Sequence, residues 1–408
     1  MSLDRLDPVR EEARGLAERF AAGGYRIYLV GGIVRDALRD RPLNTAFDLD
    51  LTTDAQPEAV KSILDEWADT LWTQGERFGT IGARRGDRRV EITTHRTERY
   101  RPDSRKPEVV FADAIEADLS RRDFTINAMA VELPDGELVD PFGGADDLHV
   151  GRLRTPLDPE ETFSDDPLRM LRAARFLAQF DLTAEPNLVA AMTAMADRLE
   201  IVAHERMRDE LDRLLALPDP GPGFELLFET GLGERVLGLV GDGHAALALL
   251  DKVGDDPVVR LAALLADAGT PADVQSALSE RRATTAVSRA VFAVLTAARR
   301  AVEFPPQSLA ELRLWVVDAD PHLPQAVMLA TALGAVNTLT ADVEALITAE
   351  PDLCGPPVLD GDEIMDLLGL EPGPEVGAAV SELRRHRLDS GFLTPEEARQ
   401  HLLRWRSS

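Results

Sequence analysis

Several residue types are scarce in this chain of 408 residues, and each scarcity excludes a class of protein. The single cysteine, Cys354, rules out a disulfide framework and a cysteine metal cluster, and we expect it to be a small buried apolar residue. No apolar run approaches the roughly 20 residues that a membrane-spanning helix needs. The N-terminus is charged and amphipathic, unlike a signal peptide. These absences predict a cytoplasmic protein that makes no contact with a membrane.

Lysine is nearly absent as well, and negative charge dominates. Lysine occurs only at Lys61, Lys106 and Lys252, and 72 acidic residues against 45 basic ones give a formal net charge of -27. Such a balance argues against a general electrostatic attraction to nucleic acid. Basic residues nevertheless outnumber acidic ones locally, between Arg77 and Lys106. The local pattern of charge therefore matters more than the sum.

The order of residue patterns predicts an α+β fold. The length favours two to four domains, and a content of 44% hydrophobic and 29% charged residues is that of a globular protein. Up to about residue 150 the pattern indicates a small mixed sheet with helices, and from Pro159 onward only helical periodicity is evident. The expected strands are 27–30, 47–52, 70–74, 80–84 and 88–94; the expected helices include 7–22, one opening at Pro57, 119–131 with Ser120 as N-cap, 164–180 with Ser164 as N-cap, 204–217 and 223–230; residues 96–110 are expected to be a loop.

One stretch of the first part carries the pattern of a phosphate-transfer site. An apolar strand ends at Gly31 and Gly32, a helix follows, and the next strand presents Asp48 and Asp50. Paired glycines at a helix start let backbone N–H groups face a phosphate. Side chains two apart on a strand share a face, so the two carboxylates need a cation between them, and Mg²⁺ suits oxygen ligands and phosphates. The unit therefore indicates metal-dependent phosphoryl or nucleotidyl transfer.

Each of these signals has an ordinary alternative. A pair of glycines is more often a simple turn, and a pair of aspartates is more often solvated surface. Glu91, on the strand VEITT, is about as suited to completing a metal site as to facing solvent. Asp166, Arg169, Arg172 and Arg175 share one side of a helix, which is also what a solvated row of ion pairs looks like. The order of the motifs, rather than any one of them, favours the functional interpretation.

Six segments, taken in order, resemble the motifs of the class II tRNA nucleotidyltransferase and bacterial poly(A) polymerase family. They are LVGGIVRDAL, FDLDLTT, RRDFTINAMAV, DPFGGADDL, DDPLRMLRAARF and ERMRDELDRLL, and they cover roughly the first 230 residues. The resemblance implies a polymerase beta-like nucleotidyltransferase head over residues 1–150, a helical neck for base recognition and RNA binding over 151–235, and a helical body and tail that binds tRNA over 236–408.

The same resemblance assigns roles to particular residues. Asp48 and Asp50 match the catalytic Mg²⁺ carboxylates; Gly32, Arg35 and Arg122 match residues at the nucleotide; Asp166 and Arg169 match the pair that reads the incoming base; Arg172 and Arg175 match further nucleotide-binding arginines. Cytosine and adenine both offer an exocyclic amine beside a ring-nitrogen acceptor. A carboxylate and a guanidinium could therefore select both bases without a nucleic-acid template.

These implications predict a CCA-adding tRNA nucleotidyltransferase that uses CTP, ATP and Mg²⁺. The expected partner is tRNA, held at its acceptor end and T arm, with the arginine-rich segment 77–106 near the RNA; no stable protein partner is expected. Within the family, a poly(A) polymerase or an enzyme adding only CC or only A is the alternative. From another class, the alternative is a catalytically silent protein that binds nucleotide or RNA.

Overall fold

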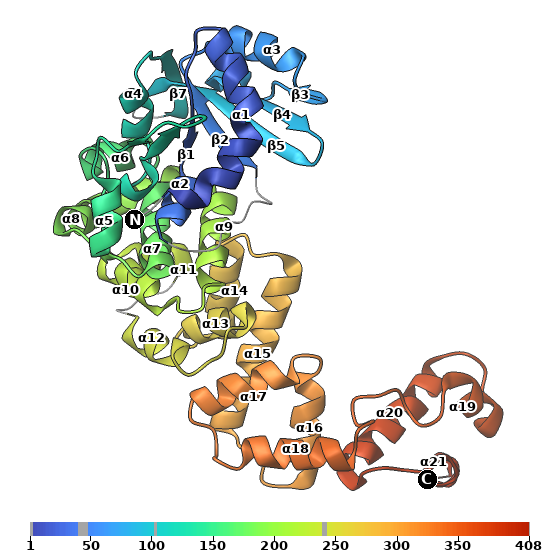
Figure 1. The fold of residues 1–408 in the computed structure, drawn as a ribbon. Coiled ribbons are helices and arrows are strands. Elements are labelled where there is room, and N and C mark those ends of the chain that lie inside the picture. The colour runs from blue at the N-terminus through green and yellow to red at the C-terminus, as the bar shows by residue number, and fades with distance from the viewer. Residues whose placement is uncertain (1–2, 40–47, 102–103, 239–242, 408) are drawn as a thin grey trace. The chain divides into compact units, whose positions relative to one another are not determined.

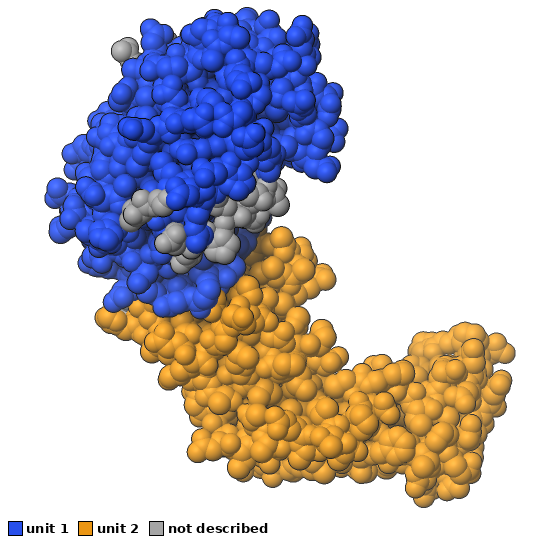
Figure 2. Space-filling model, in the orientation of Figure 1, with its two compact units in different colours: residues 1–236 blue, residues 237–408 orange. Residues whose placement is uncertain are grey.

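The computed structural model of the protein describes residues 3–39, 48–101, 104–238 and 243–407 (Figure 1). The chain divides into two compact units, Met1–Val236 and Leu237–Ser408 (Figure 2). Every strand of the described chain lies in the first unit, and the second unit is built from helices. The predicted α+β fold, with a sheet in the N-terminal part and a helical remainder, is confirmed. The finer division at residues 150 and 235 stays a prediction.

A seven-stranded mixed sheet is the scaffold of the first unit. Its strands are β1 (Ile27–Val30), β2 (Leu49–Thr53), β3 (Thr70–Trp72), β4 (Thr80–Arg85), β5 (Arg88–Thr94), β8 (Ala130–Glu132) and β9 (Leu138–Val139). They lie in the order β3-β4-β5-β2-β1-β8-β9. Strands β2 and β5 run parallel, and every other neighbouring pair is antiparallel. Phe47, expected at the start of β2, lies outside the described residues.

The burial of the strands shows which part of the sheet is open to a substrate. Helices α1 (Asp7–Ala22) and α3 (Pro57–Asp65) lie beside the sheet, where Phe20 and Val60 are fully buried (Figure 1). Strand β1 is buried at all four positions, as expected of a central strand covered on both faces. Strand β5 instead alternates between buried Val90 and Ile92 and exposed Glu91. The sheet face that carries Asp50 and Glu91 is therefore accessible to solvent at these two residues.

The prediction of a loop at residues 96–110 is wrong. Strands β6 (Arg96–Arg101) and β7 (Ser104–Phe111) form an antiparallel hairpin there, and residues 102–103 lie outside the described chain. The basic, proline-containing composition suggested a loop. Pairing with a neighbouring strand outweighs composition because strand preference depends strongly on context.

The prediction of one helix at residues 119–131 is also wrong. Helix α4 (Ile115–Ser120) ends at the residue expected to start it, and the Ser120 hydroxyl donates a hydrogen bond to the Ala117 carbonyl. A 3₁₀ turn (Thr125–Asn127) follows, and β8 then pairs with β1 and buries Ala130 and Val131. A short buried apolar run cannot be assigned to a helix or a strand from periodicity alone.

The helix expected from Ser164 is two helices. Helix α6 (Pro159–Asp165) contains Ser164, and α7 (Leu168–Phe180) begins after Pro167. A proline disfavours the helical conformation of the residue before it, and Asp166 is extended, with φ -143° and ψ 99°. Ser164 is therefore not an N-cap, and Asp166 lies at the break.

Short elements complete the first unit. They are α2 (Gly32–Leu38), α5 (Gly144–Val150), α8 (Pro186–Ala194), η4 (Ala196–Ile201), α9 (His204–Leu215), α10 (Gly221–Glu229), α11 (Leu232–Leu237) and a two-residue parallel pair of β10 (Arg152–Leu153) with β11 (Thr183–Ala184). Strand β11 is the one departure, in the described chain, from the helix-only pattern expected beyond Pro159.

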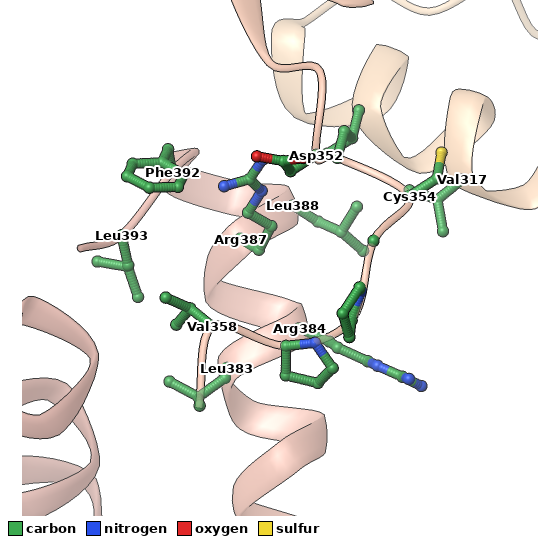
Figure 3. Close-up of a pocket in the computed structure, with 14 residues that line it drawn as sticks. Val317, Asp352, Cys354, Val358, Leu383, Arg384, Arg387, Leu388, Phe392 and Leu393 are labelled. Atoms are coloured by element: carbon green, nitrogen blue, oxygen red, sulfur yellow. The ribbon is translucent and has the colours of Figure 1, made fainter. Parts of the chain in front are cut away.

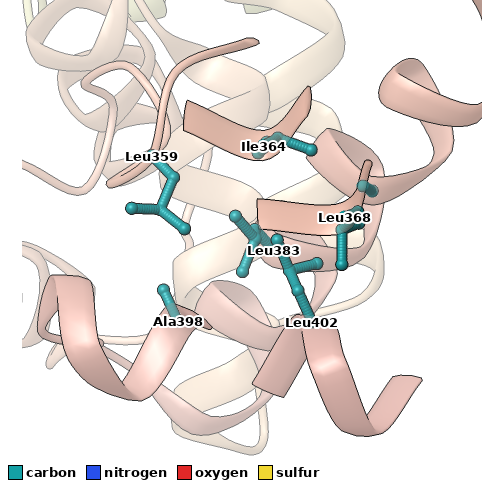
Figure 4. Close-up of a cluster of buried hydrophobic side chains, with 7 residues drawn as sticks. Leu359, Ile364, Leu368, Leu383, Ala398 and Leu402 are labelled. Carbon is teal, nitrogen blue, oxygen red and sulfur yellow. The ribbon is translucent and has the colours of Figure 1, made fainter. Parts of the chain in front are cut away.

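The second unit has its own buried clusters. Its helices are α12 (His244–Leu250), α13 (Pro257–Leu264), α14 (Pro271–Glu280), α15 (Thr285–Glu303), α16 (Leu309–Ala319), α17 (Leu323–Ala332), α18 (Leu339–Ala349), α19 (Gly361–Leu368), α20 (Pro374–Ser390) and α21 (Pro395–Arg406). Leu359, Ile364, Leu383 and Leu402 from the last three helices and the segment before them converge in one apolar cluster (Figure 4). Within the described residues, no helix combines the length and apolar character needed to cross a membrane.

Cys354 is exposed, so its prediction as a buried apolar residue is wrong. It lies in the segment between α18 and α19, where Gly355 and two prolines follow it, and such segments run over the surface. The side chain lines a cavity of about 510 Å³ together with Arg384, Arg387 and Phe392 (Figure 3). None of the residues predicted to form the nucleotide site lines this cavity.

Candidate active site

The two predicted metal carboxylates lie at the start of β2 and face the open side of the sheet. Asp50 is exposed between buried Leu49 and Leu51, and Asp48, which directly precedes the strand, is exposed as well. Strand alternation puts side chains two apart on one face. An Arg89 Nη1 atom lies 4.0 Å from Asp48 Oδ2. The acid pair therefore projects toward solvent with a cation of β5 beside it.

Glu91 lies directly across from Asp50. In the parallel register of β2 and β5, Asp50 pairs with Glu91, and both residues are exposed. Partial removal from water raises the pKa of the Asp50 carboxyl, Glu91 and Asp48 raise it further, and Arg122 opposes the rise. Two neighbouring carboxylates thus act on Asp50 at this position, and Glu91 belongs to the same face as the predicted pair.

The donor set suits a hard divalent cation that also binds phosphate. Mg²⁺ is commonly held by one or two carboxylates together with substrate phosphates. In the described residues, no three His, Cys, Asp or Glu side chains are already gathered closely enough to hold a metal by themselves. A cation among Asp48, Asp50 and Glu91 would relieve the repulsion that raises the Asp50 pKa. The residues therefore fit a metal shared with a substrate.

The glycine turn lies against an arginine. Gly31 has φ +75°, which a side chain rarely tolerates, and a Cβ built there would lie 3.2 Å from Arg122 Nη1. Gly32 then opens α2. Arg122 Nη2 lies 3.3 Å from Oδ2 of Asp118, whose side chain is fully buried. Arg122 thus borders both the glycine turn and Asp50, as a phosphate-binding residue would.

Asp118 holds two arginines that follow the C-terminal end of α4. Its Oδ1 lies 2.7 Å from Arg121 Nη2. Burial by itself would raise the pKa of the Asp118 carboxyl, but Arg121 and Arg122 outweigh burial and hold the pKa below its usual value. The carboxylate therefore stays charged and fixes the start of the RRD segment.

Arg35 is buried rather than open to solvent. Its Nη1 atom donates to Asn127 Oδ1 at 2.6 Å, its Nε atom donates to Asp36 Oδ1 at 2.9 Å, and its guanidinium carbon lies 4.2 Å from the centre of the Phe180 ring. Burial lowers the pKa of Arg35 below its usual value, although Asp36 opposes this. Arg35 links α2 to the end of α7.

Arg172 and Arg175 belong to a buried network. Arg172 donates through Nη2 and Nε to Asp123 Oδ2, at 2.6 and 2.9 Å, and Arg175 Nε donates to Glu210 Oε2 at 2.6 Å. Asn127 Nδ2 donates to Asp123 Oδ1 at 3.0 Å. Burial favours a raised pKa for Asp123, but Arg172 and the hydrogen bond from Asn127 outweigh it and lower the pKa. The network joins the RRD segment to α7 and α9.

The predicted base-reading residues are held by two different elements. Asp166 Oδ2 accepts a 2.8 Å hydrogen bond from Arg206 Nη2 of α9. Arg169 Nη2 donates to the Arg121 carbonyl at 2.6 Å, and Arg169 Nη1 donates to the Thr162 carbonyl at 3.4 Å. Because Arg121 adjoins Arg122, Arg169 reaches the segment that borders Asp50. The side chains of Asp166 and Arg169 are not hydrogen-bonded to each other in the described structure.

Comparison with known proteins assigns the family. Residues 27–154 match the Poly A polymerase head domain, and residues 181–238 match the "Probable RNA and SrmB- binding site of polymerase A". The CCA-adding enzyme of Streptococcus gordonii is 33% identical to the chain over 98% of each protein. The chain belongs to the CCA-adding enzyme family. The CCA-adding enzyme of Streptococcus sanguinis, another relative, is 32% identical over 96% of each chain.

Solved structures of CCA-adding enzymes share the fold. The crystal structure of the Bacillus stearothermophilus CCA-adding enzyme in complex with CTP is 26% identical, with a TM-score of 0.74, and the match covers 97% of this chain and 98% of that one. The Thermotoga maritima CCA-adding enzyme complexed with tRNA matches with a TM-score of 0.72 over 97% of this chain and 95% of that one, at 20% identity, which is a likeness of fold alone.

Sequence reasoning missed two residues that contact predicted nucleotide-binding residues in the structure. Asp123, two positions before the 3₁₀ turn, is the buried centre of the network that holds Arg172, and its position inside RRDF was the available signal. Arg206 holds Asp166 across 40 residues of sequence. A basic residue in the first turn of α9, where acidic residues are favoured, was the signal for it.

Proposed function

We propose that the chain is a template-independent tRNA nucleotidyltransferase that adds the C and A residues of the 3′-terminal CCA from CTP and ATP and releases pyrophosphate. The observation that carries the proposal is the acid pair Asp48 and Asp50 on an open sheet face, with Arg122 and the glycine turn beside it. Full-length relatives named CCA-adding enzymes support it.

Asp48 and Asp50 are proposed to hold Mg²⁺, and Glu91 is proposed as a third carboxylate. When bound, the metal would supply alignment of the primer hydroxyl and stabilisation of the charge that develops at the α-phosphate. The repulsion felt by Asp50 from Glu91 and Asp48 supports this role, because a cation would relieve it. The protein's own contribution is to keep Asp50 and Glu91 at one register position of adjacent strands, with Asp48 two residues before Asp50.

Arg122 and Gly32 are proposed to receive the triphosphate. Arg122 is fixed by Asp118, and Gly31 leaves room for its guanidinium. A positioned guanidinium stabilises phosphate charge through directional hydrogen bonds. Arg35, held by Asn127 and stacked on Phe180, is proposed to set the position of α2 and thereby of the glycine turn.

Asp166 and Arg169 are proposed to read the base, with Arg172 and Arg175 holding α7 in place. The carboxylate accepts a hydrogen bond from the exocyclic amine of cytosine or adenine, and the guanidinium donates to the neighbouring ring nitrogen. Uracil and guanine place a carbonyl where the amine would be. Each pairing lost in this way costs about 1 to 3 kcal/mol, which disfavours the two unwanted bases.

Incubation of the purified protein with tRNA that lacks its 3′ end tests the proposal. CTP alone should extend the RNA by two residues, ATP alone should extend only RNA that ends in CC, and both together should complete CCA. Chelation of divalent metal should abolish extension, and Mg²⁺ should restore it. No incorporation of either nucleotide would refute the function.

A poly(A) polymerase is the second candidate, because residues 27–154 match the Poly A polymerase head domain. The same gel separates the two activities. Repeated addition of A without CTP would indicate poly(A) synthesis, whereas arrest after one A would indicate CCA addition. For the CCA-adding enzyme, the second unit and residues 77–106 are proposed to bind tRNA.

A further inference from the structure

The carboxylate of Asp166 already accepts three hydrogen bonds. Its Oδ1 accepts from the Leu168 N–H at 3.2 Å and from Arg206 Nη1 at 3.4 Å, and its Oδ2 accepts from Arg206 Nη2 at 2.8 Å. An ionised carboxylate has about four acceptor positions. Both positions on Oδ1 are therefore used, and one position remains on Oδ2.

Arg206 occupies a position in α9 where a positive charge is unfavourable for the stability of the helix. Helix α9 begins at His204, so Arg206 is in the first turn, and Ala203 before it provides no side-chain cap. Positive charge near a helix N-terminus is unfavourable because the helix dipole is positive there. Residues that break a local rule of this kind are expected at functional positions.

The pair is too exposed to contribute much to folding. The side chain of Arg206 is 46% exposed and that of Asp166 is 21% exposed. Ion pairs at such positions add little to stability. A two-pronged guanidinium contact does, however, fix the plane of a carboxylate, which a single lysine ammonium cannot do.

We propose that Arg206 is a positioning residue for nucleotide choice, because its contact with Asp166 leaves Oδ2 a single acceptor position for the exocyclic amine of C or A. This inference rests on the proposed function. Arg206 fixes where that position points, and the Leu168 N–H fixes the other oxygen. The amine of a correct base meets an aligned acceptor, and the carbonyl of U or G meets a fixed negative oxygen. Without Arg206 the carboxylate rotates, and the penalty against U and G decreases.

The test compares Arg206→Gln and Arg206→Lys with the unaltered enzyme, using full-length protein and tRNA ending in C. Incorporation of CTP and of UTP is measured separately, as kcat and KM. Arg208→Gln is the control, because it removes a neighbouring cation of α9 that forms ion pairs with Asp209 and Asp212.

Arg206→Gln should lower the preference for CTP over UTP by about tenfold, a typical scale for the loss of one specific polar contact. The change should come from a higher KM for CTP and a higher relative rate with UTP, while the thermal midpoint stays close to that of the unaltered protein. Arg206→Lys, which restores charge without the two-pronged contact, should give an intermediate preference. Arg208→Gln should leave the preference unchanged.

Two results would overturn the inference. An unchanged preference for CTP over UTP in Arg206→Gln would show that Asp166 does not depend on Arg206. Faster CTP incorporation by Arg206→Gln would show that the arginine obstructs the acceptor. Both results presuppose that the unaltered enzyme incorporates CTP; failure of that reaction would instead refute the proposed function.

Discussion

At the scale of single residues, the folded site contains an electrostatic repulsion between carboxylates that lowers the stability of the protein. The Asp50 pKa is raised by partial loss of water and by the negative charges of Glu91 and Asp48. A carboxylate whose folded pKa lies above its unfolded value binds more protons in the folded state between those two values. Its ionisation therefore lowers stability as pH rises through that interval, and the cost persists at neutral pH.

Asp50→Asn should accordingly make the protein more stable and inactive. At pH 7 the neutral amide removes the repulsion, so the thermal midpoint should rise, whereas nucleotide incorporation should fall roughly a hundredfold or more because charge stabilisation at the reacting phosphate is lost. Thermal melts and primer extension measure the two effects. Asp87→Asn, in the exposed turn between β4 and β5, is the matched control and should change neither. A less stable Asp50→Asn protein would contradict the argument.

Asp118 should affect catalysis without touching the substrate. It is buried and holds Arg121 and Arg122, so Asp118→Asn leaves two arginines without their charged partner. Breaking a buried pair typically costs about 3 to 5 kcal/mol. We expect a lower free energy of unfolding in urea and a higher KM for both CTP and ATP, because Arg122 loses its fixed position. A variant with unchanged KM would show that Arg122 is held by other contacts.

At the scale of elements, His95 joins the main sheet to the β6–β7 hairpin. Its backbone N–H donates to the Thr53 carbonyl, its carbonyl accepts from Ala112, and its ring is fully buried near Tyr28. Burial lowers the pKa of His95, although Asp118 opposes this. The neutral ring is therefore the form that the folded state favours.

Stability should fall when the medium is acidified. The unfolded His95 binds a proton near its reference pKa of about 6.5, and the folded one does so only at lower pH. The contribution of neutral His95 to stability is complete above the pKa of the unfolded state. It is lost as pH falls from that pKa toward the lower pKa of the folded state. Urea unfolding between pH 7 and 5 should show this slope, and His95→Gln should weaken it. His149→Gln, at an exposed position, should keep it.

The elements also show what sequence could and could not reveal. The strand, glycine turn, helix and DxD strand were predictable because each follows from local chemistry, and Glu91 could be placed on a strand. Its position across from Asp50 depends on a parallel pairing between strands 41 residues apart, which no local pattern specifies. The break at Asp166 was available from Pro167 alone. The β6–β7 hairpin was not, because its composition suggests a loop.

At the scale of the whole molecule, a formal net charge of -27 opposes the approach of a polyanion. Screening shortens the Debye length from about 30 Å at 0.01 M salt to about 10 Å at 0.1 M. The association rate of tRNA should therefore rise over this range, in contrast to proteins that attract nucleic acid through overall positive charge. Stopped-flow mixing with labelled tRNA measures the rate. A steady fall with salt would mean that local basic charge, such as that in the sequence between Arg77 and Lys106, controls the encounter.

The contact of Arg35 with Phe180 has a consequence for substrate length. Arg35 follows the glycine turn by one helical turn, and Phe180 ends the helix that begins just after Asp166. Helix α2, which follows the proposed phosphate-binding turn, and helix α7, which carries the proposed base-reading Arg169, are thereby joined by a buried contact. We therefore expect a nucleotide with a longer spacer between sugar and base to be incorporated poorly, because this contact keeps the two proposed binding positions at a fixed separation.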